Sequence, residues 1–171
     1  MDDFERLVSV YRTRASSSVR SKLDVLMDIE RIRDPGVVPF LLQVLGDGHE
    51  SLEVRMSVVK RLRNPHPLLA PPDRQRAAMV VGEVVADTSN AELRLQAALT
   101  LGHFTDVDGV LSTLSAVSLG RDESIDLRYA AFTSVERAGP TRESIAVMRQ
   151  IASDETLGDA ARSVLSAWHV A

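Results

Sequence analysis

Apolar residues recur at helical spacing along the whole chain, and charged residues fill the positions between them. In five stretches a small apolar residue is followed by a second one four positions later and, in four of them, by a third one eight positions later. This spacing places the residues on one side of a 3.6-residue helix. Leu93, Ala97 and Leu101 are the clearest example. No segment alternates apolar and polar residues as a half-buried strand does. The pattern therefore predicts an all-α protein.

A dipeptide of an apolar residue and arginine marks each of these stretches. The arginines are Arg20, Arg55, Arg94, Arg128 and Arg162, at intervals of 34 to 39 residues. Each helical stretch but the last ends in a turn sequence, such as Asp34-Pro35-Gly36, because proline disfavours helix in the residue before it. A second apolar helical stretch and a polar loop follow. A period of this length predicts stacked two-helix units.

The period also predicts how the chain is divided. We expect a single domain over 1–171, with a cap helix in 1–18 at one end of the stack. Four two-helix repeats follow in 19–53, 54–92, 93–126 and 127–160, and a terminal helix in 161–171 closes the array. Terminal elements need this role because an internal repeat at the end of a stack leaves an apolar side uncovered.

The run from Leu93-Arg94 to Leu101-Gly102, with Asp106 after it, resembles HEAT-like repeats, especially the short bacterial form related to the phycobilisome lyases. The resemblance implies a right-handed α-α superhelix, a solenoid of about four HEAT-like helical hairpins with an N-terminal cap helix. It also implies that the second helices line a concave groove that holds a partner. Such a fold does not by itself define a function, because it serves scaffolds, carriers and a few enzymes.

Two interpretations of the arginine column stay open. In the first, the guanidinium groups form a ladder that binds a carboxylate or phosphate ligand. In the second, which we favour, the ladder is structural and each arginine meets an acid of a loop between repeats. The candidate acids are Asp47, Asp87, Asp122 and Asp154. A partly buried arginine needs such a partner because an unpaired buried charge is costly.

The second repeat is longer than its neighbours, and the extra length lies in the proline-rich stretch 64–73. We expect its four prolines to keep this stretch free of helix. The basic residues that flank it are Lys60, Arg61, Arg63, Arg74 and Arg76. They provide either a contact for an acidic or phosphate-bearing partner or a solvated helix end, where positive charge is favourable.

The second helix of each repeat supplies the other candidates for partner binding. The outward positions left once the core stripe is assigned include Phe40, Gln43, Met79, Glu83, Ser112, Ser115, Arg142 and Arg149. Phe40 and Met79, an apolar pair rimmed by polar groups, suit a binding hot spot. Alternatively, both pack between neighbouring helices. Whether this surface or the insertion at 64–76 binds the partner stays open.

Composition narrows the classes of function. A net charge of −4 and an aromatic content of 4% disfavour nucleic-acid binding, which relies on a basic surplus. No apolar stretch reaches the roughly 18 residues of a membrane span. The chain has no cysteine, which fits a reducing cytoplasm and excludes thiolate chemistry.

No residue pattern predicts catalysis, a metal site or a cofactor. His49-Glu50 is the one His-Glu pair, whereas the HEAT-like di-iron hydroxylase that such pairs resemble needs several. Neither a Gly-x-Ser-x-Gly elbow nor a nucleotide-binding glycine pattern is present. We therefore expect a non-catalytic protein–protein interaction module or adaptor. A lyase-like or hydroxylase-like HEAT-repeat enzyme or ligand carrier is the alternative.

Overall fold

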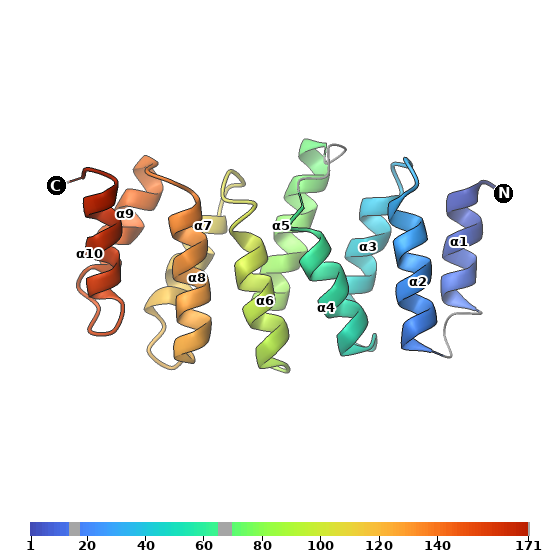
Figure 1. Cartoon of the computed structure of the whole chain (residues 1–171), viewed down its shortest axis with the longest axis horizontal. Helices are drawn as coiled ribbons and strands as arrows, with labels where there is room; N and C mark the ends of the chain where they lie inside the picture. Colours follow the sequence, from blue (N-terminus) through green and yellow to red (C-terminus); the bar gives the residue numbers. More distant parts are fainter. Residues whose placement is uncertain (14–17, 65–69, 171) are drawn as a thin grey trace. The chain divides into compact units, whose positions relative to one another are not determined.

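The computed structural model describes residues 1–13, 18–64 and 70–170, which form ten helices and no strand (Figure 1). The expected all-α class is thereby confirmed. The helices are α1 (Asp3–Arg12), α2 (Val19–Glu30), α3 (Val37–Gly46), α4 (Leu52–Arg61), α5 (Pro71–Ala86), α6 (Ala91–Leu101), α7 (Val110–Leu119), α8 (Ile125–Arg137), α9 (Arg142–Ile151) and α10 (Gly158–Ala167).

The chain divides into two compact units, Met1–Val80 and Val81–Ala171, and the boundary falls inside α5. In the first unit α2 contacts α1 and α4, and α3 contacts α4. In the second unit α8 contacts α6, α7 and α9, while α9 also contacts α10. Within this second unit, α6, α8 and α10 form the nearer layer in Figure 1, and α7 and α9 lie behind them.

Short polar side chains define where most helices begin. The residue before each of six helices accepts a hydrogen bond from a backbone N–H three positions later, and these N-cap residues are Asp2, Ser18, Ser51, Asn90, Ser124 and Thr141. Such a bond satisfies one of the N–H groups that a first helical turn leaves without a partner. Helices α4, α6 and α8 therefore begin two residues before the repeat starts expected at 54, 93 and 127.

Each compact unit has its own apolar core. Leu26, Ile29, Leu45, Val54 and Val58 are completely buried in the first unit. The second unit buries Leu114, Met148, Ile151 and Leu157 to the same extent. Burial of this kind is the main favourable contribution to folding.

The proline-rich stretch differs from the expectation in its last residues. Residues 65–69 lie outside the described part of the chain, but α5 already begins at Pro71. The expectation that 64–73 holds no helix is therefore wrong for Pro71, Pro72 and Asp73. Proline is accommodated in a first turn because its missing N–H has no intrahelical acceptor there.

Candidate functional site

A groove between α1 and α3 forms a concave surface in the first compact unit. It has a volume of about 650 Å³ and opens to solvent. Its apolar lining comes from Phe4 and Val8 of α1 and from Pro39 and Phe40 of α3. The polar lining residues are Glu5, Ser9, Arg12, Thr13 and Gln43. An apolar floor with a few polar groups on its rim is typical of binding sites.

The two helices that form this groove run parallel. At one end the ring of Phe4 lies against Gly36, the residue before α3, and at the other end Arg12 bonds Gln43. A Cβ atom at Gly36 would lie 2.6 Å from Cε1 of Phe4, so glycine permits this close approach. The groove therefore follows both helices from their N-terminal to their C-terminal ends.

Phe40 forms the floor of the groove. Only 6% of its surface is exposed, because the rings of Phe4 and Tyr11 meet it edge-on at centroid distances of 6.3 and 5.4 Å. Edge-to-face packing is a favourable arrangement of aromatic rings. The sequence placed Phe40 on an outward position or between neighbouring helices; the structure buries it under α1.

Arg12 stands on the rim beside this aromatic cluster. Its guanidinium carbon lies 5.9 Å from the centroid of Phe40, and an Nη atom donates to Oε1 of Gln43 at 3.3 Å. Contact with a ring face and a hydrogen bond together restrict the orientation of the guanidinium. Glu5 lies seven residues earlier on α1 and closes a capping box with Asp2. The rim thus carries a negative charge near the start of α1 and a positive charge near its end.

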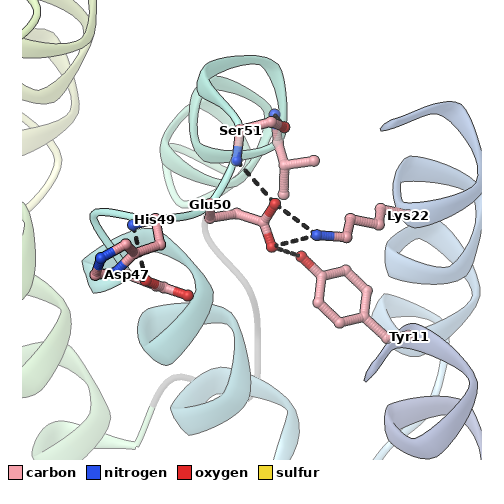
Figure 2. A network of polar contacts seen from close by, with 7 residues as sticks. Tyr11, Lys22, Asp47, His49, Glu50 and Ser51 are labelled. Carbon is pink, nitrogen blue, oxygen red and sulfur yellow. Dashed lines mark hydrogen bonds and ion pairs between the residues drawn. The ribbon is translucent and has the colours of Figure 1, made fainter. Parts of the chain in front are cut away.

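A polar network holds α1 in place (Figure 2). The hydroxyl of Tyr11 donates to Oε2 of Glu50 at 2.5 Å, and Nζ of Lys22 donates to both carboxylate oxygens at 2.8 and 3.0 Å. The backbone N–H of Ser51 donates to Oε1 at 2.8 Å. Because these groups come from α1, α2 and the loop before α4, one carboxylate joins three elements.

The network shifts the pKa of Glu50 and the pKa of Tyr11. Burial alone raises the pKa of Glu50, but the hydrogen bonds from Lys22, Tyr11 and Ser51 outweigh it, so this pKa lies below its usual value. Burial, and secondly the bond to Glu50, raise the pKa of the Tyr11 hydroxyl above its ordinary range. Near neutral pH Glu50 is therefore a carboxylate and Tyr11 a neutral phenol.

His49 does not join Glu50 in a common site. Its side chain is fully exposed and lies near Asp47, with Nδ1 3.5 Å from Oδ1, whereas the carboxylate of Glu50 faces Lys22 and Tyr11 (Figure 2). The pair thus lacks the convergent geometry of the hydroxylase-like alternative. Among the described residues, no group of three or more histidines, cysteines or acids has an arrangement that would hold a metal ion.

The arginine column has a recurring geometry. In Arg55, Arg94 and Arg128 the Nε–H group donates to a main-chain carbonyl nine or ten residues earlier, at 2.7 to 2.8 Å. Arg162 reaches the equivalent carbonyl of Ala152 through Nη1 at 2.5 Å. Each side chain therefore bonds the end of the preceding helix.

Acids of the following loops complete part of this ladder. Arg94 makes two 2.9 Å bonds to Glu123, and Arg128 bonds Asp154 at 2.6 Å. Asp154 was among the acids expected from the sequence; Glu123 stands beside the expected Asp122. The hydrogen bond to Glu123 is the main reason that the pKa of Arg94 is raised.

Lys22 occupies the first position of the ladder, where the sequence analysis placed Arg20. Lys22 lies four residues after the N-cap Ser18, as Arg55 lies four after Ser51 and Arg128 four after Ser124. It bonds Glu50, the acid that precedes the next N-cap, whereas Arg20 is exposed. The apolar–arginine dipeptide at Val19 is thus displaced by two residues from the structural register.

The basic residues around the insertion lie in different environments. Lys60 and Arg76 are exposed, and Arg61 is paired with Glu30 and with Ser57. Arg63 and Arg74 are half-buried, and burial lowers the pKa of Arg63. Arg61 therefore belongs to a part-buried ion pair, which leaves Lys60 and Arg76 as the exposed cations of the set.

The remaining candidates lie on three helices. Met79, exposed over 60% of its surface, and Glu83 lie one turn apart on α5. Ser112 and Ser115 are on α7, where Ser115 lies 3.5 Å from the amide oxygen of Gln150 on α9. Arg142 and Arg149 are exposed on α9. The candidates that the structure brings together in the groove are Phe40 and Gln43.

The sequence assigned no role to Arg12, Tyr11 or Lys22, and Glu50 was considered only as part of a His-Glu pair. The distance from N-cap to cation was a readable signal for Lys22, because the same four-residue interval recurs at later helices. No spacing in the sequence connects Tyr11 with Glu50, since their contact depends on how α1 packs. The same holds for Arg12 and Gln43.

No protein-family model matches the chain, and no curated protein matches it. None of the described helices has both the length and the apolar character needed to cross a lipid bilayer.

Proposed function

We propose that this protein is a non-catalytic interaction module that binds a protein partner through the groove between α1 and α3. The observation that carries the proposal is the groove itself, a volume of about 650 Å³ with an aromatic floor and a charged rim. Aromatic side chains and arginine are the residues that contribute most often to binding hot spots. Here Phe4, Phe40 and Arg12 supply both kinds.

The structural role of the other charged groups supports a binding function over a catalytic one. Glu50, the acid of the polar network, accepts hydrogen bonds from three donors and thereby links α1, α2 and the loop before α4. Arg55, Arg94 and Arg128 are bonded to carbonyl groups of their own compact unit. Side chains so engaged maintain the shape of the helices, which favours docking on a preformed surface because little entropy is lost.

As the architecture, we propose HEAT-like helical hairpins that stack into a right-handed α-α superhelix. The recurring interval between N-cap and cation, and the recurring bond from that cation to the preceding helix, support it. The lack of cysteine fits a cytoplasmic location.

Small-angle X-ray scattering tests the superhelix: we expect a radius of gyration above the roughly 16 Å of a compact domain of this length. A value at or below it contradicts the superhelix.

Affinity capture with the full chain tests the binding function. Val8→Glu places a charge on the apolar side of the groove, and we expect the proteins captured from a lysate of the source organism to be lost. Leu52→Glu is the matched control, because Leu52 is an exposed apolar residue in the first turn of α4, where an acid is well tolerated. Capture that survives Val8→Glu, or that is lost equally with Leu52→Glu, contradicts the proposal.

A further inference from the structure

We infer that the occupant of the groove is an amphipathic helix that runs antiparallel to α1 and α3, with an acidic residue near its start and a basic residue seven positions later. This inference rests on the proposed function, since it specifies the partner of the same groove. It follows from three properties of the site: the spacing of its lining residues, the two charges on its rim, and the direction of its helices.

The lining residues repeat at helical spacing on both walls. On α1 they lie four residues apart, at Phe4, Val8 and Arg12, and on α3 Pro39 and Gln43 show the same interval. Two parallel rows of side chains with this period form a channel along the helix axes. A third helix fits such a channel, because its own side chains three and four residues apart fall between the rows.

The two rim charges set the charge pattern of the partner. Glu5 and Arg12 are seven residues apart, which is close to two turns and about 10 Å along α1. A carboxylate and an ammonium group seven residues apart on the docked helix have the same separation. Arg12 has further N–H donors besides the one that Gln43 accepts, and Glu5 has a second oxygen besides the one that the N–H of Asp2 reaches.

The helix directions decide which end of the partner carries the acid. Both α1 and α3 have their C-terminal ends near Arg12 and Gln43. An antiparallel partner begins at this end, so its positive N-terminus lies beside the negative C-terminal ends. The acid in the partner's first turns then contacts Arg12, and the base in its last turns contacts Glu5. The same placement of charges stabilises the partner helix through its own dipole.

The apolar floor lies between the two charges. Phe4, Val8, Pro39 and Phe40 accept two apolar side chains that lie three and four residues after the partner's acid. The recognition pattern is therefore an acid at position i, apolar residues at i+3 and i+4, and a base at i+7. This stripe occupies one side of a helix.

The probe is a synthetic alanine-rich peptide, blocked at both ends, with Glu at i, Leu at i+3 and i+4, and Lys at i+7. It is titrated into the ¹⁵N-labelled full chain and followed by NMR. We expect chemical-shift changes along 4–13 and 36–43. A second peptide with Glu and Lys exchanged keeps the composition, and circular dichroism of both peptides corrects for the less favourable placement of its charges in the helix dipole. After this correction we expect it to bind about fivefold more weakly, because two exposed ion pairs become repulsive.

A charge-swap cycle assigns the effect to Arg12. We expect Arg12→Glu to weaken the binding of the first peptide. It should restore affinity for a peptide with Lys at both i and i+7, because the lysine at i then faces an acid. Arg12→Gln, which introduces no repulsion, should weaken the first peptide to a smaller extent. Equal affinity for the two peptides of the first titration, no binding of either, or shift changes outside the groove would overturn the inference.

Two outcomes separate this inference from the proposed function. If the peptides show no charge preference but Val8→Glu still abolishes capture, the groove binds a partner of a different form and only the inference fails. If the chain dimerises and Val8→Glu makes it monomeric, the occupant is a second copy, which also overturns the inference. Capture that is unaffected by Val8→Glu refutes the function itself.

Discussion

Glu50 shows how one residue determines the position of a whole helix. Its carboxylate accepts bonds from Tyr11 of α1, Lys22 of α2 and the backbone N–H of Ser51 just before α4, and only 7% of its side chain is exposed. Removing one partner of a buried pair between a carboxylate and an ammonium group lowers the free energy of unfolding by several kcal/mol. The wall of the groove that α1 forms therefore depends on a residue outside the groove.

The lowered pKa of Glu50 predicts a loss of stability in acid. The unfolded chain takes up a proton at this carboxyl at a higher pH than the folded chain does, so the contribution is complete above the ordinary pKa and declines as pH falls below about 4.5. Urea unfolding between pH 7 and pH 3 measures it. We expect Glu50→Gln to destabilise the protein at pH 7 by about 2 kcal/mol and to flatten the decline.

Glu53→Gln is the control for the loss of one negative charge, because Glu53 lies three residues after Glu50 and its side chain is exposed. We expect a change at pH 7 of less than about 0.5 kcal/mol. If Glu50→Gln leaves the acid dependence unaltered, the network does not stabilise the fold in the way described.

The ladder offers a second comparison between equivalent residues in different environments. Arg128 has 8% of its side chain exposed and bonds the carbonyl of Ser118 and Asp154, whereas Arg162 has 58% exposed. We expect Arg128→Ala to lower the free energy of unfolding by about 3 kcal/mol and Arg162→Ala by less than about 1 kcal/mol. Chemical denaturation measures both, and equal losses would contradict a burial-dependent role.

At the scale of elements, the contact of α6 with α8 depends on a close approach at Gly102. A Cβ atom there would lie 2.8 Å from Oγ of Ser134 and 3.0 Å from its Cα, and the same hydroxyl donates to the carbonyl of Ala98 at 2.7 Å. The backbone of Gly102 has ordinary helical torsions, so the requirement for glycine is steric. Any larger residue must displace α8.

Gly102→Ala and Gly82→Ala therefore have opposite expected effects. The first should destabilise the protein by about 1 to 3 kcal/mol through overpacking. Gly82 lies inside α5, and apart from its chain neighbours and the backbone of its own helix no atom lies within 4 Å of an added Cβ, so alanine there should stabilise by about 0.5 to 1 kcal/mol. Thermal unfolding of the two variants checks the prediction, and a stabilised Gly102→Ala variant would refute the steric argument.

At the scale of the whole molecule, the boundary between the compact units lies within one continuous helix. The sequence analysis expects a single domain, and α5 contributes residues to both units. We therefore expect cooperative unfolding.

Trp168, the one tryptophan, reports on the second unit. Leu26→Ala creates a cavity in the first unit, at a cost of about 2 to 5 kcal/mol, and should shift the Trp168 fluorescence transition as well. An unshifted transition would show that the units unfold independently.

The helices were readable from the sequence because their apolar positions and caps are local signals. Pro71 shows the limit of such signals, since its effect depends on whether it falls in a first turn or an interior. The site was readable only in part. Gln43 was placed outward correctly by helical phase, but the burial of Phe40 follows from α1, whose docking depends on Tyr11 and Glu50, 39 residues apart. A contact that occurs once, between the cap helix and the first repeat, leaves no periodic trace in a sequence.

The ladder has a consequence for protein engineering. Lys22 with Glu50, Arg94 with Glu123, and Arg128 with Asp154 each form a pair in which both members lie between the N-cap of one helix and the start of the second helix after it. A segment cut at the N-caps, such as 90–123, carries its cation and its acid together. Duplicating or transplanting that segment therefore keeps both members of the ion pair together. The Nε–H of its arginine remains available to donate to a carbonyl at the end of whichever helix precedes the segment.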